Sequence, residues 1–336
     1  MQNIEVLYIL RKISWRKLLN ILQLISSYLV SKILRKPLHW GMPMAVSVEP
    51  TTACNLHCPE CPSGLRSFSR PTGNMKFELY QKYVDGFIST ISGMTFYFQG
   101  EPFINKDLFN MIRYASSQGV YTMSSTNGHF LNEENCIQII DSGLDRLVIS
   151  LDGTTQESYE KYRVGGEISS VLKGISQLVR FKKDKNSKTP FIILQFIVFR
   201  HNEHELDDIK ILAKRLGVNR LEIKSAQIYN YTKGSDLIPE SDVYSRYSKN
   251  SDGRYLIKNN FLNECWRMWQ GCVITWDGKV VPCCFDKDAS HQLGDLNYSS
   301  FLEIWKGDKY NELRTQLLMG RSNIEICRNC TEGTLA

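Results

Sequence analysis

Ten cysteines occur in this chain of 336 residues, and seven of them fall into two groups. The first group has the spacing C-x3-C-x2-C, which puts Cys54, Cys58 and Cys61 on one short loop. Such a loop can bind three irons of a four-iron cluster and leave the fourth without a protein ligand, whereas ferredoxins use cysteine at all four. An open iron can chelate a substrate or cofactor, so the spacing indicates catalysis rather than electron storage. A zinc loop that also uses His57 is the alternative.

The second group lies in the last quarter of the chain and consists of Cys265, Cys283, Cys327 and Cys330. Between the first two, Asp277-Gly278 predicts a type I′ turn that joins the β-rich runs Cys272–Trp276 and Lys279–Val281. Such a hairpin places Cys265 and Cys283 at the same end of the small domain. The C-x2-C pair Cys327 and Cys330 could then complete a four-cysteine site. A zinc ribbon is the alternative for this region.

Three cysteines are expected to pack rather than to bind metal. If the second strand continues beyond Val281, Cys284 points away from the face that carries Cys283. Cys272 lies inside an apolar run and is expected to be a small buried hydrophobic residue. Cys272 or Cys284 is the substitute if the ligand set differs from the four named above. Cys136 falls in a predicted amphipathic helix and is expected to be structural.

An α/β scaffold is expected to position these groups. Short apolar runs predict six strands, at Ala45–Glu49, Thr95–Phe98, Tyr121–Ser124, Arg146–Leu151, Phe191–Phe199 and Arg220–Lys224. Amphipathic stretches between them predict helices, at Lys106–Ser117, Asn132–Ser142, Ser169–Lys182 and Glu205–Leu216. Strands that alternate with helices form a parallel sheet. Six such units predict a partial (β/α)6 barrel, with its chemistry at the C-terminal ends of the strands.

Four regions follow from this pattern. We expect a basic, amphipathic helical segment over residues 1–40, the partial barrel over 41–235, a linker over 236–260 and a small hairpin-and-helix iron–sulfur domain over 261–336. The linker is predicted because residues 227–260 are rich in Tyr, Ser, Asp and Lys and lack periodicity.

The net charge of +6 is confined to one end of the chain. Residues 1–36 contain seven bases and the single acid Glu5, which leaves 34 bases and 34 acids elsewhere. A neutral body does not indicate nucleic-acid binding. Within the basic segment, the uncharged run Leu18–Ser31 has 14 residues, fewer than the roughly 20 that span a membrane. A helix that caps the barrel and peripheral contact with the inner membrane face are the two alternatives. Clustered thiols otherwise indicate a reducing cytoplasm.

The first cysteine motif resembles that of the radical S-adenosylmethionine (SAM) superfamily, and the resemblance covers roughly residues 44–336. It implies that the open iron binds the amino and carboxylate groups of SAM. It also implies that an electron from a reductant such as flavodoxin or ferredoxin releases a 5′-deoxyadenosyl radical, which abstracts hydrogen from the substrate. Glu60 departs from the family pattern, which often has an aromatic residue just before the third cysteine.

Three further segments resemble the SAM-binding elements of this family. Gln99-Gly100-Glu101-Pro102 is similar to the Gly-Gly-Glu-Pro element, in which the acid accepts from the SAM amino group. The end of the fourth predicted strand, with Ser150 as a hydroxyl donor and Asp152 in the loop that follows, is similar to the ribose-binding strand. Arg163 matches the family's contact with the SAM carboxylate. Gln195 could contact SAM or substrate.

The second cysteine group resembles the SPASM or shortened twitch extension of radical SAM enzymes. The resemblance implies one auxiliary 4Fe–4S cluster, bound by Cys265, Cys283, Cys327 and Cys330. Relatives with such extensions modify peptides or dehydrogenate aminocyclitol-like molecules. We therefore expect peptide modification, with a small-molecule or glycan dehydrogenase as the alternative and a non-catalytic iron–sulfur protein as a third possibility. No general base is evident in the sequence.

Overall fold

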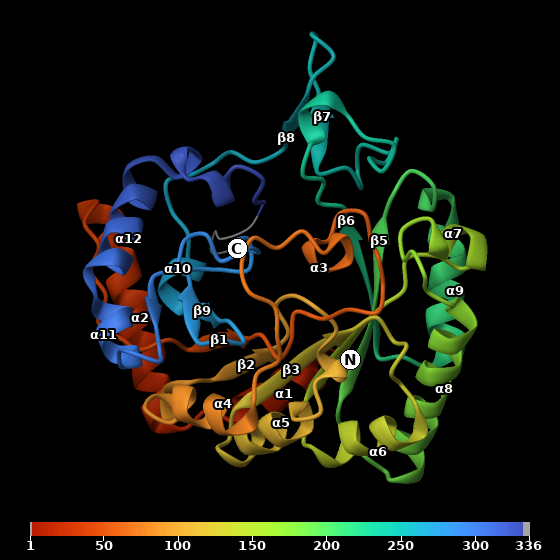
Figure 1. Ribbon diagram of the computed structural model, residues 1–336, viewed down its shortest axis with the longest axis horizontal. Coiled ribbons are helices and arrows are strands. Elements are labelled where there is room, and N and C mark those ends of the chain that lie inside the picture. The colour runs from red at the N-terminus through yellow and green to blue at the C-terminus, as the bar shows by residue number, and fades with distance from the viewer. Residues whose placement is uncertain (1, 332–336) are drawn as a thin grey trace. The chain divides into compact units, whose positions relative to one another are not determined.

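The computed structural model describes residues 2–331 and contains two compact units (Figure 1). The first unit consists of the chain up to Thr52, Phe68–Met123 and the chain from Asn260 onward. The second consists of Ala53–Ser67 and Ser124–Asn259. Strand β3 (Tyr121–Thr126) begins in the first unit and ends in the second.

The sheet of the first unit has β1 (Ala45–Val48) at its centre. Its strand order is β11-β10-β9-β1-β2, followed by the start of β3. The other members are β2 (Gly93–Phe96), β9 (Gly271–Ile274), β10 (Lys279–Val281) and β11 (Gly294–Asp295). Strand β1 is parallel to β2 on one edge and to β9 on the other. The predicted hairpin is present as β9 and β10, and its first strand extends the parallel sheet.

Helices of the first unit come from both ends of the chain and from the segment between β1 and β3. They are α1 (Gln2–Arg11), α2 (Trp15–Leu34), α4 (Phe77–Val84), α5 (Leu108–Ser117), α10 (Arg267–Gln270), α11 (Phe301–Lys306) and α12 (Asp308–Gly320). Two buried tryptophans hold the segment after α2 against the C-terminal helices. The indole nitrogen of Trp269 donates to Leu38 O at 2.8 Å, and that of Trp305 donates to Gly41 O at 3.1 Å. The segment that follows α2 therefore packs against the cysteine-rich region, residues 265–330.

The second unit contains β4 (Arg146–Ser150), β5 (Phe191–Val198) and β6 (Arg220–Ser225), which are parallel and adjacent in that order after β3. Its helices are α3 (Pro62–Leu65), α6 (Glu133–Asp141), α7 (Gln156–Glu160), α8 (Ile168–Asp184) and α9 (Leu206–Leu216) (Figure 1). All six predicted strands are thus present. The α/β class with a parallel sheet is confirmed, and the strand–helix alternation agrees with an open barrel.

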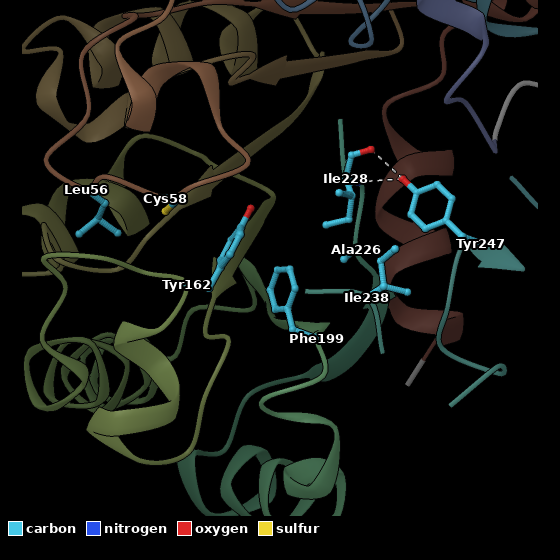
Figure 2. Close-up of a cluster of buried hydrophobic side chains, with 8 residues drawn as sticks. All are labelled: Leu56, Cys58, Tyr162, Phe199, Ala226, Ile228, Ile238 and Tyr247. Atoms are coloured by element: carbon cyan, nitrogen blue, oxygen red, sulfur yellow. Dashed lines mark hydrogen bonds between the residues drawn. The ribbon is translucent and has the colours of Figure 1, made fainter. Parts of the chain in front are cut away.

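A short antiparallel hairpin lies within the segment that the sequence predicts to be a linker. Strands β7 (Tyr247–Lys249) and β8 (Tyr255–Ile257) meet at a turn in which Gly253 has a φ of +80°. The hairpin is anchored by Tyr247, which is buried and whose hydroxyl accepts from Ile228 N at 2.8 Å and donates to Ile228 O at 3.1 Å (Figure 2). Strands of three residues with polar exposed positions have too short a pattern to be recognised in the sequence.

Close pairing of β9 with β1 depends on the absence of a side chain at Gly271. A Cβ atom at this position would lie 1.8 Å from Ala45 O, and Ala45 is its register partner on β1.

We predict that Gly271→Ala lowers the free energy of unfolding by at least about 2 kcal/mol, because the two backbones must separate. Thermal unfolding followed by circular dichroism measures this change. Gly86→Ala is the matched control, since a Cβ there meets no atom within 4 Å. Equal melting temperatures for the two variants would contradict the prediction.

Candidate iron–sulfur and cofactor sites

The loop that carries the first three cysteines is compact and ends in a helical turn. Cys61 precedes α3, and its N–H donates to Cys58 O at 3.3 Å. Gly64, inside α3, lies against the backbone of Cys58, because a Cβ at Gly64 would be 2.5 Å from Cys58 N. The turn can therefore fold back on the loop only with glycine at this position.

The three thiols of this loop lie near one another in an apolar environment. Cys58 is buried in a cluster with Leu56, Tyr162 and Phe199 (Figure 2). Cys54 and Cys61 pack against the same cluster. Burial raises the pKa of the Cys58 thiol to about 11, and the charge of Arg163 partly offsets this. A thiolate at this position therefore needs positive charge beside it, which iron would supply.

A buried ion pair lies next to these thiols. Both Nε and Nη2 of Arg163 are 2.6 Å from Oδ2 of Asp152, whose side chain is fully buried. Burial alone would lower the pKa of Arg163, but the charges of Asp152, Cys58 and the neighbouring tyrosines together outweigh burial and raise that pKa well above its ordinary value. The other carboxylate oxygen accepts from Ile197 N at 2.7 Å. Both oxygens of Asp152 are thus engaged within the protein, and the carboxylate fixes the guanidinium close to Cys58.

Polar side chains form a row across the parallel strands of the second unit. Ser150 on β4 is in register with Gln195 on β5, which is in register with Glu222 on β6. Residues in register on neighbouring parallel strands project from the same face. Glu222 forms ion pairs with Arg220 and Lys224 on its own strand. The row gives this face of the sheet hydrogen-bonding groups beside Ser150, the predicted ribose contact.

Two further residues make contacts near the cysteine loop: Asn127, which was not identified from the sequence, and Glu60, which departs from the family pattern. Asn127, which follows β3, donates from Nδ2 to Asn55 Oδ1 at 2.7 Å and to Cys54 Sγ at 3.9 Å. Its side-chain oxygen accepts from His129 N at 3.1 Å. The Asn-Gly pair at 127–128, shortly after the predicted strand Tyr121–Ser124, is the signal that could have indicated this position. Glu60, which replaces the usual aromatic residue, accepts from Tyr229 N at 2.8 Å.

The Gln99-Gly100-Glu101 element belongs to the first unit and forms a tight turn after β2. Gly100 has a φ of +73°, so the left-handed position falls on the glycine that the sequence retains. Glu101 is buried and caps the 3-10 turn Pro102–Ile104, with Oε1 accepting from Phe103 N at 3.3 Å. A glutamine in place of the first family glycine is therefore compatible with this turn.

The four C-terminal thiols predicted as ligands lie close to one another in the first unit. The thiol of Cys283 interacts electrostatically with those of Cys265 and Cys327, and Cys265 interacts with Cys330. Burial raises the pKa of Cys265, Cys283 and Cys327. The remaining cysteines differ: Cys272 lies beside Tyr310 and Arg314, and Cys284 is exposed.

A buried arginine that the sequence did not reveal lies among these thiols. Nη2 of Arg321 is 3.3 Å from Cys330 Sγ, and Nη1 donates to Glu264 O at 3.1 Å. Burial alone would lower the pKa of Arg321, but the neighbouring thiols outweigh this and raise it. Arg321 therefore repeats, at the second group of thiols, the arrangement of Arg163 at the first.

Thiols are the ligands that both cysteine groups offer to a metal. Among residues 2–331, no three His, Cys, Asp or Glu side chains are close enough to bind one metal ion together. In a four-iron cluster each thiolate binds a different iron, so the sulfurs stand further apart. The donor chemistry, buried thiols beside a fixed cation, fits iron–sulfur clusters at both places.

A pocket of about 250 Å³ opens in the first unit next to Cys283. Its lining includes Ser47 on β1, Thr95 on β2 and Tyr97 just after β2. The lining also includes Arg267, whose Nη1 is 4.0 Å from Cys284 Sγ. A pocket with hydroxyl groups and a guanidinium can hold a small polar group beside the C-terminal thiols.

Comparison with known families agrees with this geometry. The Radical SAM superfamily matches residues 48–215, which is half of the chain. The chain belongs to the radical SAM superfamily. The SPASM iron–sulfur cluster-binding domain matches residues 265–331. The protein is therefore a radical SAM enzyme that uses SAM and 4Fe–4S clusters, as the cysteine spacing predicted.

Characterised relatives act on different kinds of substrate. The PqqA peptide cyclase of Rhodopseudomonas palustris is 29% identical over 82% of this chain and 77% of its own length. The AdoMet-dependent heme synthase of Oleidesulfovibrio alaskensis is 24% identical over 79% of this chain and 75% of its own.

Two solved structures share the fold at lower identity. Streptococcus suis SuiB bound to S-adenosylmethionine has a TM-score of 0.63 at 13% identity, covering 88% of this chain and 74% of SuiB. BtrN in complex with AdoMet and 2-DOIA has a TM-score of 0.53 at 17% identity, covering 87% of this chain and 94% of BtrN.

The ligand assignment predicts how iron content responds to single substitutions. Anaerobically reconstituted wild-type protein should contain about eight irons per chain, and Cys283→Ser should retain about four. Cys272→Ser is the matched control and should keep about eight, because this thiol lies beside Tyr310 and Arg314. The triple alanine variant of Cys54, Cys58 and Cys61 should also retain about four. Iron and sulfide analysis with Mössbauer spectroscopy measures these values. Loss of a cluster in Cys272→Ser but not in Cys283→Ser would reverse the assignment.

Proposed function

We propose that this radical SAM enzyme modifies a peptide or protein. The cysteine loop with the Asp152–Arg163 pair beside it carries the assignment of the SAM site. Similarity to PqqA peptide cyclase over most of both chains supports a peptide substrate. With its cluster bound, SAM would supply a 5′-deoxyadenosyl radical that abstracts a hydrogen atom from the substrate.

Residues of this chain would bind and orient SAM. Arg163 offers a planar, permanently charged guanidinium to the SAM carboxylate, and Asp152 positions it rather than contacting SAM, since both of its oxygens are engaged. Glu101 would accept from the SAM amino group, and Ser150 would donate to the ribose. Gln99 and Gly100 would shape the turn that carries Glu101.

The second group of thiols would serve the later part of the reaction. Cys265, Cys283, Cys327 and Cys330 would hold the group that takes up an electron when the product is oxidised. The pocket beside Cys283 would then accept the substrate group, with Arg267 as an anion-binding residue. A reductant such as flavodoxin or ferredoxin would supply the electron that starts the reaction.

A small-molecule or glycan dehydrogenase is the second candidate. The pocket volume of about 250 Å³ accommodates one sugar-sized ring as well as one amino-acid side chain. The size of the pocket therefore allows both substrates.

Substitution of the buried pair tests the SAM site. We predict that Arg163→Lys and Asp152→Asn raise the KM for SAM about tenfold or more, because each removes a charge-assisted, two-point contact. Uncoupled cleavage of SAM to 5′-deoxyadenosine measures KM and kcat, with iron content as the control for cluster assembly. Glu157→Gln is the matched control, because its ion pair with Lys161 is exposed. An unchanged KM in Arg163→Lys would contradict the assignment.

Deuterium transfer tests the substrate class and the roles of the two clusters. Wild-type enzyme incubated with a fractionated lysate from cells grown in deuterated medium should form deuterated 5′-deoxyadenosine. Prior protease digestion of that fraction should abolish the transfer if the substrate is a peptide, whereas transfer that survives digestion would favour the small-molecule alternative. Cys58→Ala should lose all SAM cleavage. Cys327→Ala should retain cleavage but form no product, and full turnover by this variant would contradict an essential auxiliary cluster.

A further inference from the structure

Helix α2 has its polar and apolar faces reversed with respect to the protein interior. The inward face carries the buried polar residues Lys17, Asn20, Ser27 and Ser31, together with Leu24 and Tyr28. The opposite face, here called the outer apolar stripe, consists of the exposed residues Trp15, Leu18, Leu19, Leu22, Leu29 and Ile33. At 100° per residue these two sets lie on opposite sides of the helix. A surface helix of a water-soluble protein shows the reverse arrangement.

Hydrogen bonds of the inward face fix this orientation. Asn20 donates to Met42 O and accepts from Met42 N, both at 2.8 Å. Lys17 Nζ donates to Gly119 O at 2.6 Å, and the Ser31 hydroxyl donates to Leu38 O at 3.0 Å. Rotation of α2 to bury its leucines would break all of these bonds. These bonds therefore keep the stripe exposed to solvent, and the side chains of Trp15 and Ile33 are 71% and 79% exposed.

More exposed apolar residues lie next to both ends of α2. In α1, Val6, Leu7 and Leu10 are exposed. At the other end, Nη1 of Arg35 contacts Asn263 O at 3.2 Å and Leu318 O at 3.4 Å. These contacts bring the neighbouring exposed residues Leu262 and Met319 close to the end of the helix. An apolar surface of this extent indicates an interaction site.

The exposed charges of the N-terminal segment itself, residues 5–36, have one sign. The exposed bases are Arg11, Arg16, Arg35 and Lys36, at the two ends of α2. Glu5, the one acid among residues 1–36, is buried and accepts from the Tyr121 hydroxyl at 2.9 Å. An apolar stripe between clusters of bases is complementary to an anionic lipid surface.

We propose that α2 docks this enzyme on an anionic phospholipid bilayer, with the helix parallel to the surface and the outer apolar stripe inserted at the interface. Among the described residues, α2 is the one helix whose length and composition would suffice to cross a membrane. It does not cross one, because its inward face is bonded to the rest of the first unit. Nor does a second copy of the chain suit the stripe, since a symmetric contact would bring like charges together.

Vesicle flotation with full-length, cluster-reconstituted enzyme tests the proposal. Wild-type protein should float with vesicles of phosphatidylcholine and phosphatidylglycerol, much less with phosphatidylcholine alone, and less again at high salt. The double substitution Leu22→Glu/Ile33→Glu should lower the partition coefficient at least tenfold while SAM cleavage and iron content stay unchanged. Ile211→Glu is the matched control, because Ile211 is an exposed apolar residue on helix α9 of the second unit, and it should float as wild type does.

Three results would overturn docking on lipid. The first is failure of wild-type enzyme to float with the anionic vesicles. The second is equal flotation of wild type and the double variant. The third is a wild-type dimer, measured by light scattering without vesicles, that the double substitution converts to a monomer, because a second copy would then occupy the stripe. None of these results depends on the substrate, so they leave the proposed peptide modification to its own test.

Discussion

Buried thiols need positive charge beside them, and both cysteine sites of this enzyme provide it from within the fold. Low polarity around a thiol disfavours its ionised form, the form that binds iron. Arg163 lies next to Cys58, and Arg321 lies next to Cys330. Arg163 is largely buried and Arg321 is fully buried, and each is held by an acceptor of the protein, Asp152 in the first case and the Glu264 carbonyl in the second. At each site, a protein acceptor thus orients a guanidinium, and the guanidinium lies beside the thiols that would bind iron.

The chemistry could be predicted from the sequence because it depends on short spacings. Three cysteines within eight residues define the open cluster site, and six apolar runs define the parallel strands. Distant contacts could not be predicted in this way. Nothing near Asp152 in the sequence shows that Ile197 N occupies one of its oxygens, and nothing near Arg321 shows that it lies beside the thiols of Cys265, Cys327 and Cys330. These roles arise only when segments far apart in the chain are brought together.

The orientation of helix α2 also depends on contacts that could not be predicted from the sequence. Its periodicity predicts an amphipathic helix, but periodicity alone does not say which face the protein covers. The polar face turns inward because main-chain groups of Met42, Gly119 and Leu38 bond to it, and none of these groups is marked in the sequence. The choice between a capping helix and a membrane-docking helix therefore depended on the structure. The inward face caps the first unit, and the outward face is the apolar surface on which the proposed docking on lipid rests.

Parallel pairing of β9 with β1 has a consequence for how the chain can be divided. If the chain were cut before Asn260, β1 would lose its neighbour and become an edge strand with unpaired main-chain donors and acceptors. Val46 and Val48 would lose part of the covering that now keeps them from solvent. Unprotected edges of this kind pair with other chains and cause aggregation. The cysteine-rich region is therefore also the cover of the sheet edge, and the barrel part alone is a poor choice for expression as a separate fragment.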